Sequence, residues 1–358
     1  MNYRRWQIGA LLGALLISAV VYAKNSAEPV YQDVLETSAQ LSKLAPLTLL
    51  NSIVSTGKRL IAVGHRGHIV YSDDQGKTWT QSMVPVGSDL VAVYFPSEKN
   101  GWAVGHDGVV LQTSDGGVNW TKQLDGRAAA ELMTKHYSNN SSSEAGAAGT
   151  MQADIKRYQE QGPDKPFLDV WFQNDTTGYI VGAFGLIFRT SDGGKSWIPL
   201  FDRIDNPKRY HLYAIKPVGS ELYVCGEQGS VFKLDAAAGR FKEIKTPYAG
   251  TYFGVTGKPG SLIVYGMRGK VFRSSDDGSS WKSVETGVPA GITGSTILED
   301  GRIVLVSQIG NVLISDDNGV TFKQINVQKS VQAAAVTSIN KDTLVVVGFR
   351  GANIIPTK

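Results

Sequence analysis

Short runs of β-branched and aromatic residues alternate along the chain with tight polar turns that contain glycine. Three examples are "LIAVGHRGHIVYS" (60–72), "GWAVGHDGVVLQT" (101–113) and "GYIVGAFGLIFRT" (178–190), each with a Gly-x-x-Gly turn between two apolar runs. Apolar runs joined by such a turn are typical of antiparallel β-hairpins. The pattern therefore predicts an all-β protein built from repeated hairpins.

The residue that opens each turn recurs at a nearly constant spacing. It is found at Gly64, Gly105, Gly182, Gly226, Gly266, Ser307 and Gly348. The differences between these numbers are 41, 77, 44, 40, 41 and 41, and 77 is one repeat plus about 36 inserted residues. A period near 41 is that of a four-stranded propeller blade. We predict one all-β domain, residues 24–358, forming a seven-bladed β-propeller of four-stranded antiparallel blades.

The seventh repeat has only three predicted strands before Lys358. We expect the stretch that precedes the first blade, residues 28–47, to donate the missing fourth strand. Such a closure would tie the two ends of the domain together and remove open sheet edges, which invite aggregation.

The insertion runs from Gly126 to about Pro163, between repeats two and three. Its two ends, "AAAELMTKHY" and "MQADIKRYQEQ", have helical composition, and the link "SNNSSSEAGAAGT" between them is small and polar. We expect two short helices joined by a flexible link. Whether they form a lid or a docking arm stays open.

The first 23 residues have the pattern of an export signal. A basic start, "MNYRR", is followed by the uncharged and mostly apolar Trp6–Val21 and then by small residues around Ala23. We predict that a signal peptidase removes residues 1–23 and that the protein is periplasmic. The alternative is an uncleaved anchor, although a spanning helix needs about 20 apolar residues.

Five repeats carry a polar box at the turn between their third and fourth strands. The first is "SDDQGKTW" (72–79), and the shared pattern Ser/Thr-x-Asp-x-Gly-x-x-Trp is the Asp-box of sialidase-type repeats. Its acids are Asp74, Asp115, Asp192, Asp276 and Asp317, and its aromatic residues are Trp79, Trp120, Trp197, Trp281 and Phe322. The fourth repeat keeps only the aromatic residue, Phe241.

The physical roles of these residue types favour a structural box. An acid at a tight turn accepts hydrogen bonds from backbone N–H groups, glycine permits a left-handed backbone, and the aromatic ring packs between blades. Each box belongs to a different blade, so the acids lie too far apart to work as a catalytic pair of carboxyls. We predict no catalytic residue among them.

Strand direction alternates within a blade, so the Gly-x-x-Gly turns and the insertion should share one face, opposite the boxes. The candidate partner-binding residues are the exposed members of these turns: Arg66, Arg268, Arg350, His65, His106, Phe184 and Phe349. Ring closure should bring Arg350 near Arg66, with His65, His68 and His106 close by. A basic and aromatic mouth would bind a carboxylate or an acidic protein segment. The alternative is a set of ordinary solvated turn residues.

The net charge, the single cysteine and the histidines limit which partners and ligands we expect. The net charge of +4 falls to about +2 when the leader with Arg4 and Arg5 is removed, so we expect no nucleic-acid partner. The single cysteine, Cys225, lies in a strand-like run and is interpreted as a buried core residue without a disulfide. The five histidines lack ligand spacing, so we predict neither a metal site nor a cofactor.

Two stretches carry a family resemblance. "AVYFPSEKNGWAVGHDGVVLQTSDGGVNW" (92–120) and "DVWFQNDTTGYIVGAFGLIFRTSDGGKSW" (169–197) resemble the repeat of the photosystem II assembly and stability factors of cyanobacteria and plastids. The likeness covers about Asn51 to Pro356, apart from the insertion and the fourth box. It implies a seven-bladed propeller without enzymatic activity that helps membrane-protein subunits assemble through an arginine-rich patch. Arg66, Arg268 and Arg350 are the candidate counterparts.

Two function classes follow. The first is an exported, monomeric scaffold, peripheral to the outer face of a bacterial inner membrane, that binds subunits of a membrane complex. The partner need not be a photosystem, because the leader looks proteobacterial. The second is a sialidase-like glycoside hydrolase or a glycan-binding propeller, suggested by the three arginines. No Arg-Ile-Pro motif precedes the first box, and no Tyr/Glu nucleophile pair is evident.

Overall fold

The computed structural model describes residues 32–138, 145–327 and 331–357. The chain divides into two compact units, Met1–Asp33 and Val34–Lys358. The predicted leader, residues 1–23, lies outside the described residues, as does the centre of the predicted flexible link, residues 139–144. Among the described residues, no helix has the length and apolar character needed to cross a membrane.

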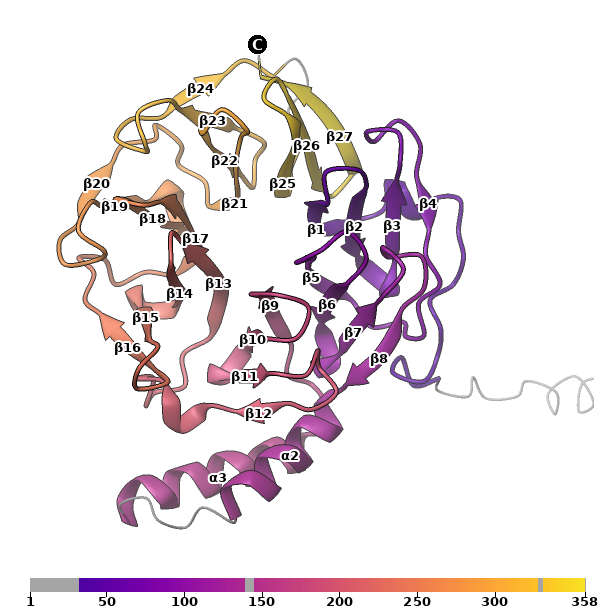
Figure 1. Ribbon diagram of the computed structural model, residues 1–358, viewed down its shortest axis with the longest axis vertical. Helices are drawn as coiled ribbons and strands as arrows, with labels where there is room; N and C mark the ends of the chain where they lie inside the picture. The colour runs from indigo at the N-terminus through magenta and orange to yellow at the C-terminus, as the bar shows by residue number, and fades with distance from the viewer. Residues whose placement is uncertain (1–31, 139–144, 328–330, 358) are drawn as a thin grey trace, which may run out of the picture. The chain divides into compact units, whose positions relative to one another are not determined.

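Seven antiparallel sheets make up the second unit, which confirms the predicted seven-bladed β-propeller (Figure 1). The first three blades comprise β1 (Leu50–Ser55), β2 (Leu60–Gly64), β3 (Ile69–Ser72) and β4 (Thr80–Gln81); β5 (Leu90–Tyr94), β6 (Gly101–Gly105), β7 (Val110–Thr113) and β8 (Thr121–Leu124); and β9 (Phe167–Phe172), β10 (Gly178–Gly182), β11 (Ile187–Thr190) and β12 (Ile198–Pro199).

The other four blades continue around the ring with the same strand order. They comprise β13 (Leu212–Val218), β14 (Glu221–Gly226), β15 (Val231–Asp235) and β16 (Arg240–Ile244); β17 (Tyr252–Lys258), β18 (Ser261–Gly266), β19 (Val271–Ser274) and β20 (Lys282–Val284); β21 (Ile292–Ile297), β22 (Ile303–Ser307), β23 (Val312–Ser315) and β24 (Lys323–Ile325); and β25 (Ala333–Asn340), β26 (Thr343–Gly348) and β27 (Gly351–Pro356).

The core consists of apolar layers between neighbouring blades. The second strand of a blade is packed on both faces, and every residue of β2, β6, β10 and β22 is buried. This explains why the sequence shows continuous apolar runs there rather than alternation. Between blades two and three, the rings of Trp102 and Phe172 stack with centroids 3.6 Å apart.

The seventh blade requires a correction. Its described sheet has three strands, and residues 32–49, which include the described part of the predicted donor segment, contain no strand. The ring closes instead by packing of β25 and β26 against β1. Short 3₁₀ turn η1 (Ala45–Leu47) lies against β27, with Ala45 buried in the layer between the seventh and first blades. Apolar contact between blades therefore replaces the expected strand pairing.

The insertion forms the two expected helices, α2 (Gly126–Ser138) and α3 (Ala145–Gln161). They pack against each other, and α2 also packs against β12, at the rim of the ring (Figure 1). Met133 of α2 and Ile155 and Tyr158 of α3 are buried in the same apolar cluster as blades two to four. The helices are thus fastened to the ring and do not hang free from it.

Every inner strand contains a β-bulge near its start, on the side of the Gly-x-x-Gly turns. The pairing skips one residue in each first strand, and the skipped residues are Asn51, Val91, Leu168, Tyr213, Phe253, Thr293 and Ala334. All seven line the central channel, which has a volume of about 780 Å³. A β-bulge changes the direction in which a side chain points. Because the bulge recurs in all seven inner strands, the bulged residues together form the channel mouth.

Candidate partner-binding face

The molecule has two faces with different turns, and contacts of the insertion distinguish them. Gly108, at the end of a Gly-x-x-Gly turn, approaches Gly126 of α2 so closely that an added Cβ would lie 2.6 Å from its Cα. Tyr158 of α3 donates a hydrogen bond of 2.7 Å to the carbonyl oxygen of Phe184, in the next such turn. We call this side, with its turns at 64–67, 105–108, 182–185, 226–229, 266–269, 307–310 and 348–351, the turn face, and the opposite side the box face.

In each of the five boxes on the box face, hydrogen bonds join the acid, the first hydroxyl and backbone N–H groups of the same turn. In the first, the hydroxyl of Ser72 donates to Asp74 and accepts from the N–H of Gly76, both at 2.8 Å. The N–H and hydroxyl of Thr78 donate to the two oxygens of Asp74, at 2.8 and 2.6 Å. The indole N–H of Trp79 donates to the carbonyl oxygen of Gly76. The carboxylate is therefore fully engaged within its own turn.

These bonds stabilise the ionised carboxylates. The hydroxyl of Thr78, together with its N–H, lowers the pKa of Asp74 to about 2, and the hydroxyls of Ser280 and Ser274 lower the pKa of Asp276 to about 2. Partial burial opposes ionisation at Asp317, yet the hydrogen bonds from Thr321 still lower its pKa to about 2. Carboxylates held in this state do not serve as proton donors near neutral pH.

Sequence reasoning missed one member of the box. The position four residues after the acid supplies both the N–H and the side-chain group that close the loop of bonds. It is Thr78, Asn119, Ser196, Ser280 and Thr321 in the five boxes. All five side chains carry a hydrogen-bond donor, and this recurring residue class is the signal that could have identified the position.

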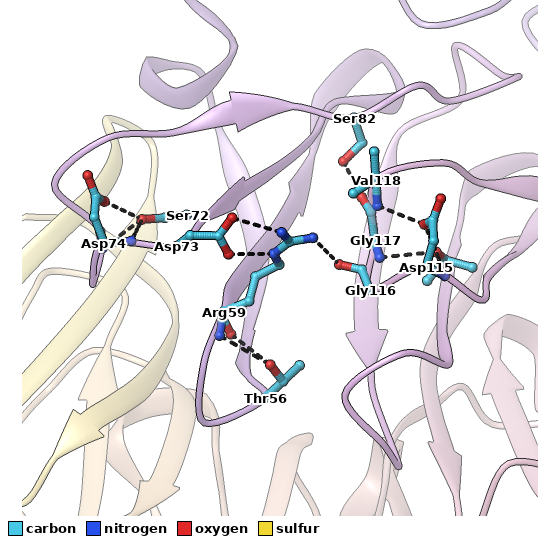
Figure 2. A network of polar contacts seen from close by, with 12 residues as sticks. Thr56, Arg59, Ser72, Asp73, Asp74, Ser82, Asp115, Gly116, Gly117 and Val118 are labelled. Carbon is cyan, nitrogen blue, oxygen red and sulfur yellow. Dashed lines mark hydrogen bonds and ion pairs between the residues drawn. The ribbon is translucent and has the colours of Figure 1, made fainter.

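Arg59 joins the first two blades on the box face (Figure 2). Its guanidinium donates two bonds to Asp73 of the first box, at 2.6 and 2.8 Å, and one of 2.9 Å to the carbonyl oxygen of Gly116 in the second box. It also lies 4.2 Å from the ring centre of Tyr71. The planar fork of arginine matches this bidentate contact. The boxes thus fasten neighbouring blades as well as their own turns.

The turn face has a special backbone. In five of its turns the second inner residue adopts a left-handed conformation: Arg66, Asp107, Phe184, Gln228 and Arg268, with φ between 54° and 58°. The glycine that follows is also left-handed, as at Gly67 with φ of 70°, and together they make the tight hairpin turn. Arg350 is outside this set, so Arg66 and Arg268 share a backbone geometry that Arg350 lacks.

A basic group lies at the first blade. The imidazole of His65 is 3.5 Å from Asp89, which also accepts a 2.7 Å bond from the N–H of Arg66. His68 is buried beneath them and contacts Thr48 at 3.3 Å. Burial, reinforced by the positive charge of Arg66, lowers the pKa of His68. The fixed cation of this group is therefore Arg66.

Four aromatic rings extend from the third to the fifth blade. Phe184 lies 4.7 Å from His211, His211 lies 6.4 Å from Tyr213, and Tyr213 lies 5.6 Å from Phe253, measured between ring centres. The N–H of Phe184 donates to His211. Of these four rings, only Phe184 was predicted from the sequence as a site residue, because the other three come from inner strands and their connections, where aromatic residues are expected in the core.

An ion pair between a buried acid and a partly exposed lysine lies in the channel. Asp169 of β9 is buried, accepts from the N–H of Ile215 at 2.9 Å, and lies 2.7 Å from the ammonium group of Lys216. His65, Asp89 and His106 also line the channel. Within the described part of the chain, no cluster of three or more His, Cys, Asp or Glu residues could hold a metal ion.

The structure brings only some of the predicted site residues together. His65 and His106 line the channel with Asp89, while Arg268, Phe349 and Arg350 are exposed on turn tips outside it. In the described residues, the guanidinium groups of Arg66, Arg268 and Arg350 form no ion pair. They therefore form a dispersed basic rim and no convergent triad.

A second hollow lies on the box face at the fourth blade, where the box is missing. It has a volume of about 1130 Å³ and is lined by charged side chains that include Glu221, Lys233 and Asp235. Trp171 and Tyr179, whose ring centres are 6.2 Å apart, also line it.

Comparison with known proteins places the chain in a family. A family model described as "Photosynthesis system II assembly factor YCF48" matches residues 21–113 and 151–355. The chain is 24% identical over 191 residues to "Photosystem II assembly lipoprotein Ycf48" of Synechococcus sp. (strain CC9902), which covers 52% of this chain and 57% of that protein. It is 24% identical over 189 residues to "Photosystem II stability/assembly factor HCF136, chloroplastic" of Oryza sativa subsp. japonica, 45% of each chain. The chain spans about half the length of these curated relatives.

An enzyme is also among the matches. "Xyloglucanase" of Hypocrea jecorina (strain QM6a) is 26% identical over 175 residues, covering 38% of this chain and 20% of that one. Among solved structures, "YCF48 bound to D1 peptide" is 16% identical with a TM-score of 0.63, covering 92% of this chain and 99% of that one. "YCF48 from Cyanidioschyzon merolae" is 15% identical with a TM-score of 0.61, covering 89% and 98%. These structural likenesses support the propeller fold.

Proposed function

Because this chain belongs to the photosynthesis system II assembly factor YCF48 family, we propose that it is a non-enzymatic scaffold that binds subunits of a membrane complex and assists their assembly or stability. Its ligand is an extended protein segment with acidic and apolar side chains. The segment lies across the turn face, between the basic group of the first blade and the aromatic rings of the third to fifth blades. One solved relative is described as bound to a D1 peptide.

The arrangement of charge and aromatic surface around the channel mouth carries this proposal. Arg66, Arg268 and Arg350 are exposed, and their charges are not neutralised by ion pairs within the described chain. The rings of Phe184, His211, Tyr213 and Phe253 form an apolar surface on the same face. Guanidinium groups bind carboxylates and aromatic rings bind apolar side chains, so the two groups suit different parts of one peptide.

The scaffold works outside the cytoplasm in this proposal. The leader pattern of residues 1–23 supports export, and the word lipoprotein in the names of the cyanobacterial relatives is consistent with it. The protein acts as a monomer, peripheral to the membrane, at the outer face of the inner membrane. Neither nucleic acid nor a cofactor takes part.

Partner capture tests the proposal. The protein is isolated from its native envelope after mild crosslinking, and the proteins that come with it are identified. A discrete membrane complex is expected, and Arg66→Glu, Arg268→Glu and Arg350→Glu together should abolish its capture. The matched control reverses the charge of three exposed lysines on the box face, which lie in the boxes or in the outer strands that follow them: Lys77, Lys195 and Lys282. If the control abolishes capture and the arginine variant does not, the interface lies on the box face.

A glycan-binding or glycoside-hydrolase propeller is the second candidate. The xyloglucanase match and the hollow at the fourth blade favour it. The stacked Trp171 and Tyr179 would contact a sugar ring, and Glu221 and Asp235 would supply polar contacts. Turnover of a fluorogenic sialoside or glucan, with no protein partner recovered, would overturn the scaffold proposal in favour of this second function.

A further inference from the structure

The segment that precedes the first blade wraps around the turn face. Ala39 packs beside Gly67, where an added Cβ would lie 3.1 Å from that of Ala39. The hydroxyl of Thr48 contacts His68, and Pro46 approaches Gly351 of the seventh blade so closely that an added Cβ would lie 2.0 Å from its carbonyl oxygen. The segment thus connects the turn that holds Arg66 with the turn that holds Arg350.

Three leucines of this segment expose most of their surface. Leu41, Leu44 and Leu47, which we call the leucine row, are 62%, 63% and 65% exposed, and Phe349 in the adjoining turn is 66% exposed. The backbone around them is fixed: the N–H of Ser42 donates to Gln81, whose amide donates back to Gln40. An ordered row of large apolar side chains in water marks an interaction site.

Cations lie around the row, and the acids beside them are engaged: Glu36 pairs with Lys122, and Asp89 lies 3.5 Å from His65. No acidic residue occurs between Glu36 and Asp73, or after Asp342. Lys43 is exposed within the row, and Arg66 and Arg350 are exposed in the two turns that the segment connects. Apolar side chains surrounded by cations match the boundary between acyl chains and anionic headgroups.

We propose that the leucine row and Phe349 dock the propeller on the surface of a lipid bilayer that contains anionic lipids, with the turn face toward the membrane. Apolar side chains enter the interface, and Lys43, Arg66 and Arg350 lie among the headgroups. This docking rests on the proposed function in one respect, because the docked propeller presents its turn face to a partner embedded in the same membrane. It adds a lipid contact that partner binding does not require.

An environment-sensitive fluorophore tests the contact in the full chain. Cys225, the single native cysteine, is fully buried and its thiol pKa is raised by burial, so a thiol reagent labels only an introduced cysteine in the folded protein. Leu44→Cys and Phe349→Cys carry the fluorophore on the turn face. Val320→Cys carries it in the box of the sixth blade, at an exposed apolar position of the box face.

Vesicles of phosphatidylcholine, with and without phosphatidylglycerol, are then added. A blue shift with increased emission is expected at positions 44 and 349 on the anionic vesicles, with no change at 320. Lys43→Glu, in the Leu44→Cys background, should reduce that response. No response at 44 and 349, or an equal response at 320, overturns the proposal.

Capture in detergent extract separates the two proposals, because it needs no bilayer. Capture without a fluorophore response would overturn only the membrane contact, and a response without capture would overturn only partner binding.

Discussion

The two faces of the propeller use similar turns for different ends. Both rely on left-handed residues next to glycine, as at Gln75–Gly76 in the first box and Arg66–Gly67 in the first turn. On the box face the acid and hydroxyl groups bond to one another and to their own backbone, five times in nearly the same geometry. On the turn face the guanidinium groups of Arg66, Arg268 and Arg350 have no such partners in the described chain, and the side chains differ from blade to blade.

That difference distinguishes a structural repeat from a binding surface. A polar group already satisfied by its own turn gains little from a ligand, whereas an unpaired cation or an exposed ring does gain. Variation between blades is what a single asymmetric partner needs, since it meets each blade only once.

The largest expected effect is a loss of stability when an aromatic residue of the box face is truncated. Trp120 is buried between the first two blades, edge-on to Phe95 at 6.0 Å. Trp120→Ala should lower the free energy of unfolding by about 3–5 kcal/mol, because a large cavity replaces the ring. Urea unfolding followed by circular dichroism measures it. Phe349→Ala, on the turn face, should change the value by less than about 0.5 kcal/mol. Equal losses of unfolding free energy in the two variants would contradict the distinction between a structural box face and a binding turn face.

Salt should weaken binding at the turn face far more than it changes the stability of the fold. Exposed charges are screened within about 10 Å at 0.1 M salt and within about 3 Å at 1 M. Partner capture through Arg66, Arg268 and Arg350 should therefore weaken steeply between these concentrations, while the unfolding midpoint in urea changes little. Capture that persists unchanged at 1 M salt would show that the aromatic rings, not the arginines, dominate binding.

Acid should act on the box face. A carboxyl with a pKa of about 2 in the folded protein and about 3.9 when unfolded contributes stability above pH 4, and that contribution is lost as the pH falls toward 2. The stabilising effect of Asp276 should thus shrink over this window. Unfolding midpoints of the wild type and Asp276→Asn, measured from pH 7 to pH 2, should converge at the acidic end. A constant difference would contradict the box as described.

The smallest effect concerns the contact between boxes. Arg59→Lys removes the bidentate bond to Asp73 and the bond to Gly116, and should cost about 1 kcal/mol, since Asp73 is largely solvent-exposed. Differential scanning calorimetry at low and at high salt measures it. Lys58→Gln, which removes the neighbouring exposed pair with Glu98, is the control and should cost less.

Much of the fold could be read from local signals. The spacing of Gly64, Gly105 and their counterparts gave the blade count, because each blade repeats the same turn geometry. The box acids were predicted to accept hydrogen bonds within their own turns, but Thr78 and its equivalents were not predicted, since a single hydroxyl or amide at that position looks like an ordinary surface residue. His211, Tyr213 and Phe253 were missed because only the folded ring brings them beside Phe184.

The chain's repeated pattern by itself determined the propeller, its seven blades and the assignment of turns to faces, because strand period and turn chemistry act over a few neighbouring residues. Tertiary structure alone decided how the ring closes. Residues 28–47 were expected to donate a strand to the seventh blade. In the described part of that segment, Ala45 instead packs between the last and first blades, and the leucine row is left exposed. Contacts between residues some three hundred positions apart depend on the shape of the closed ring, which no local pattern encodes.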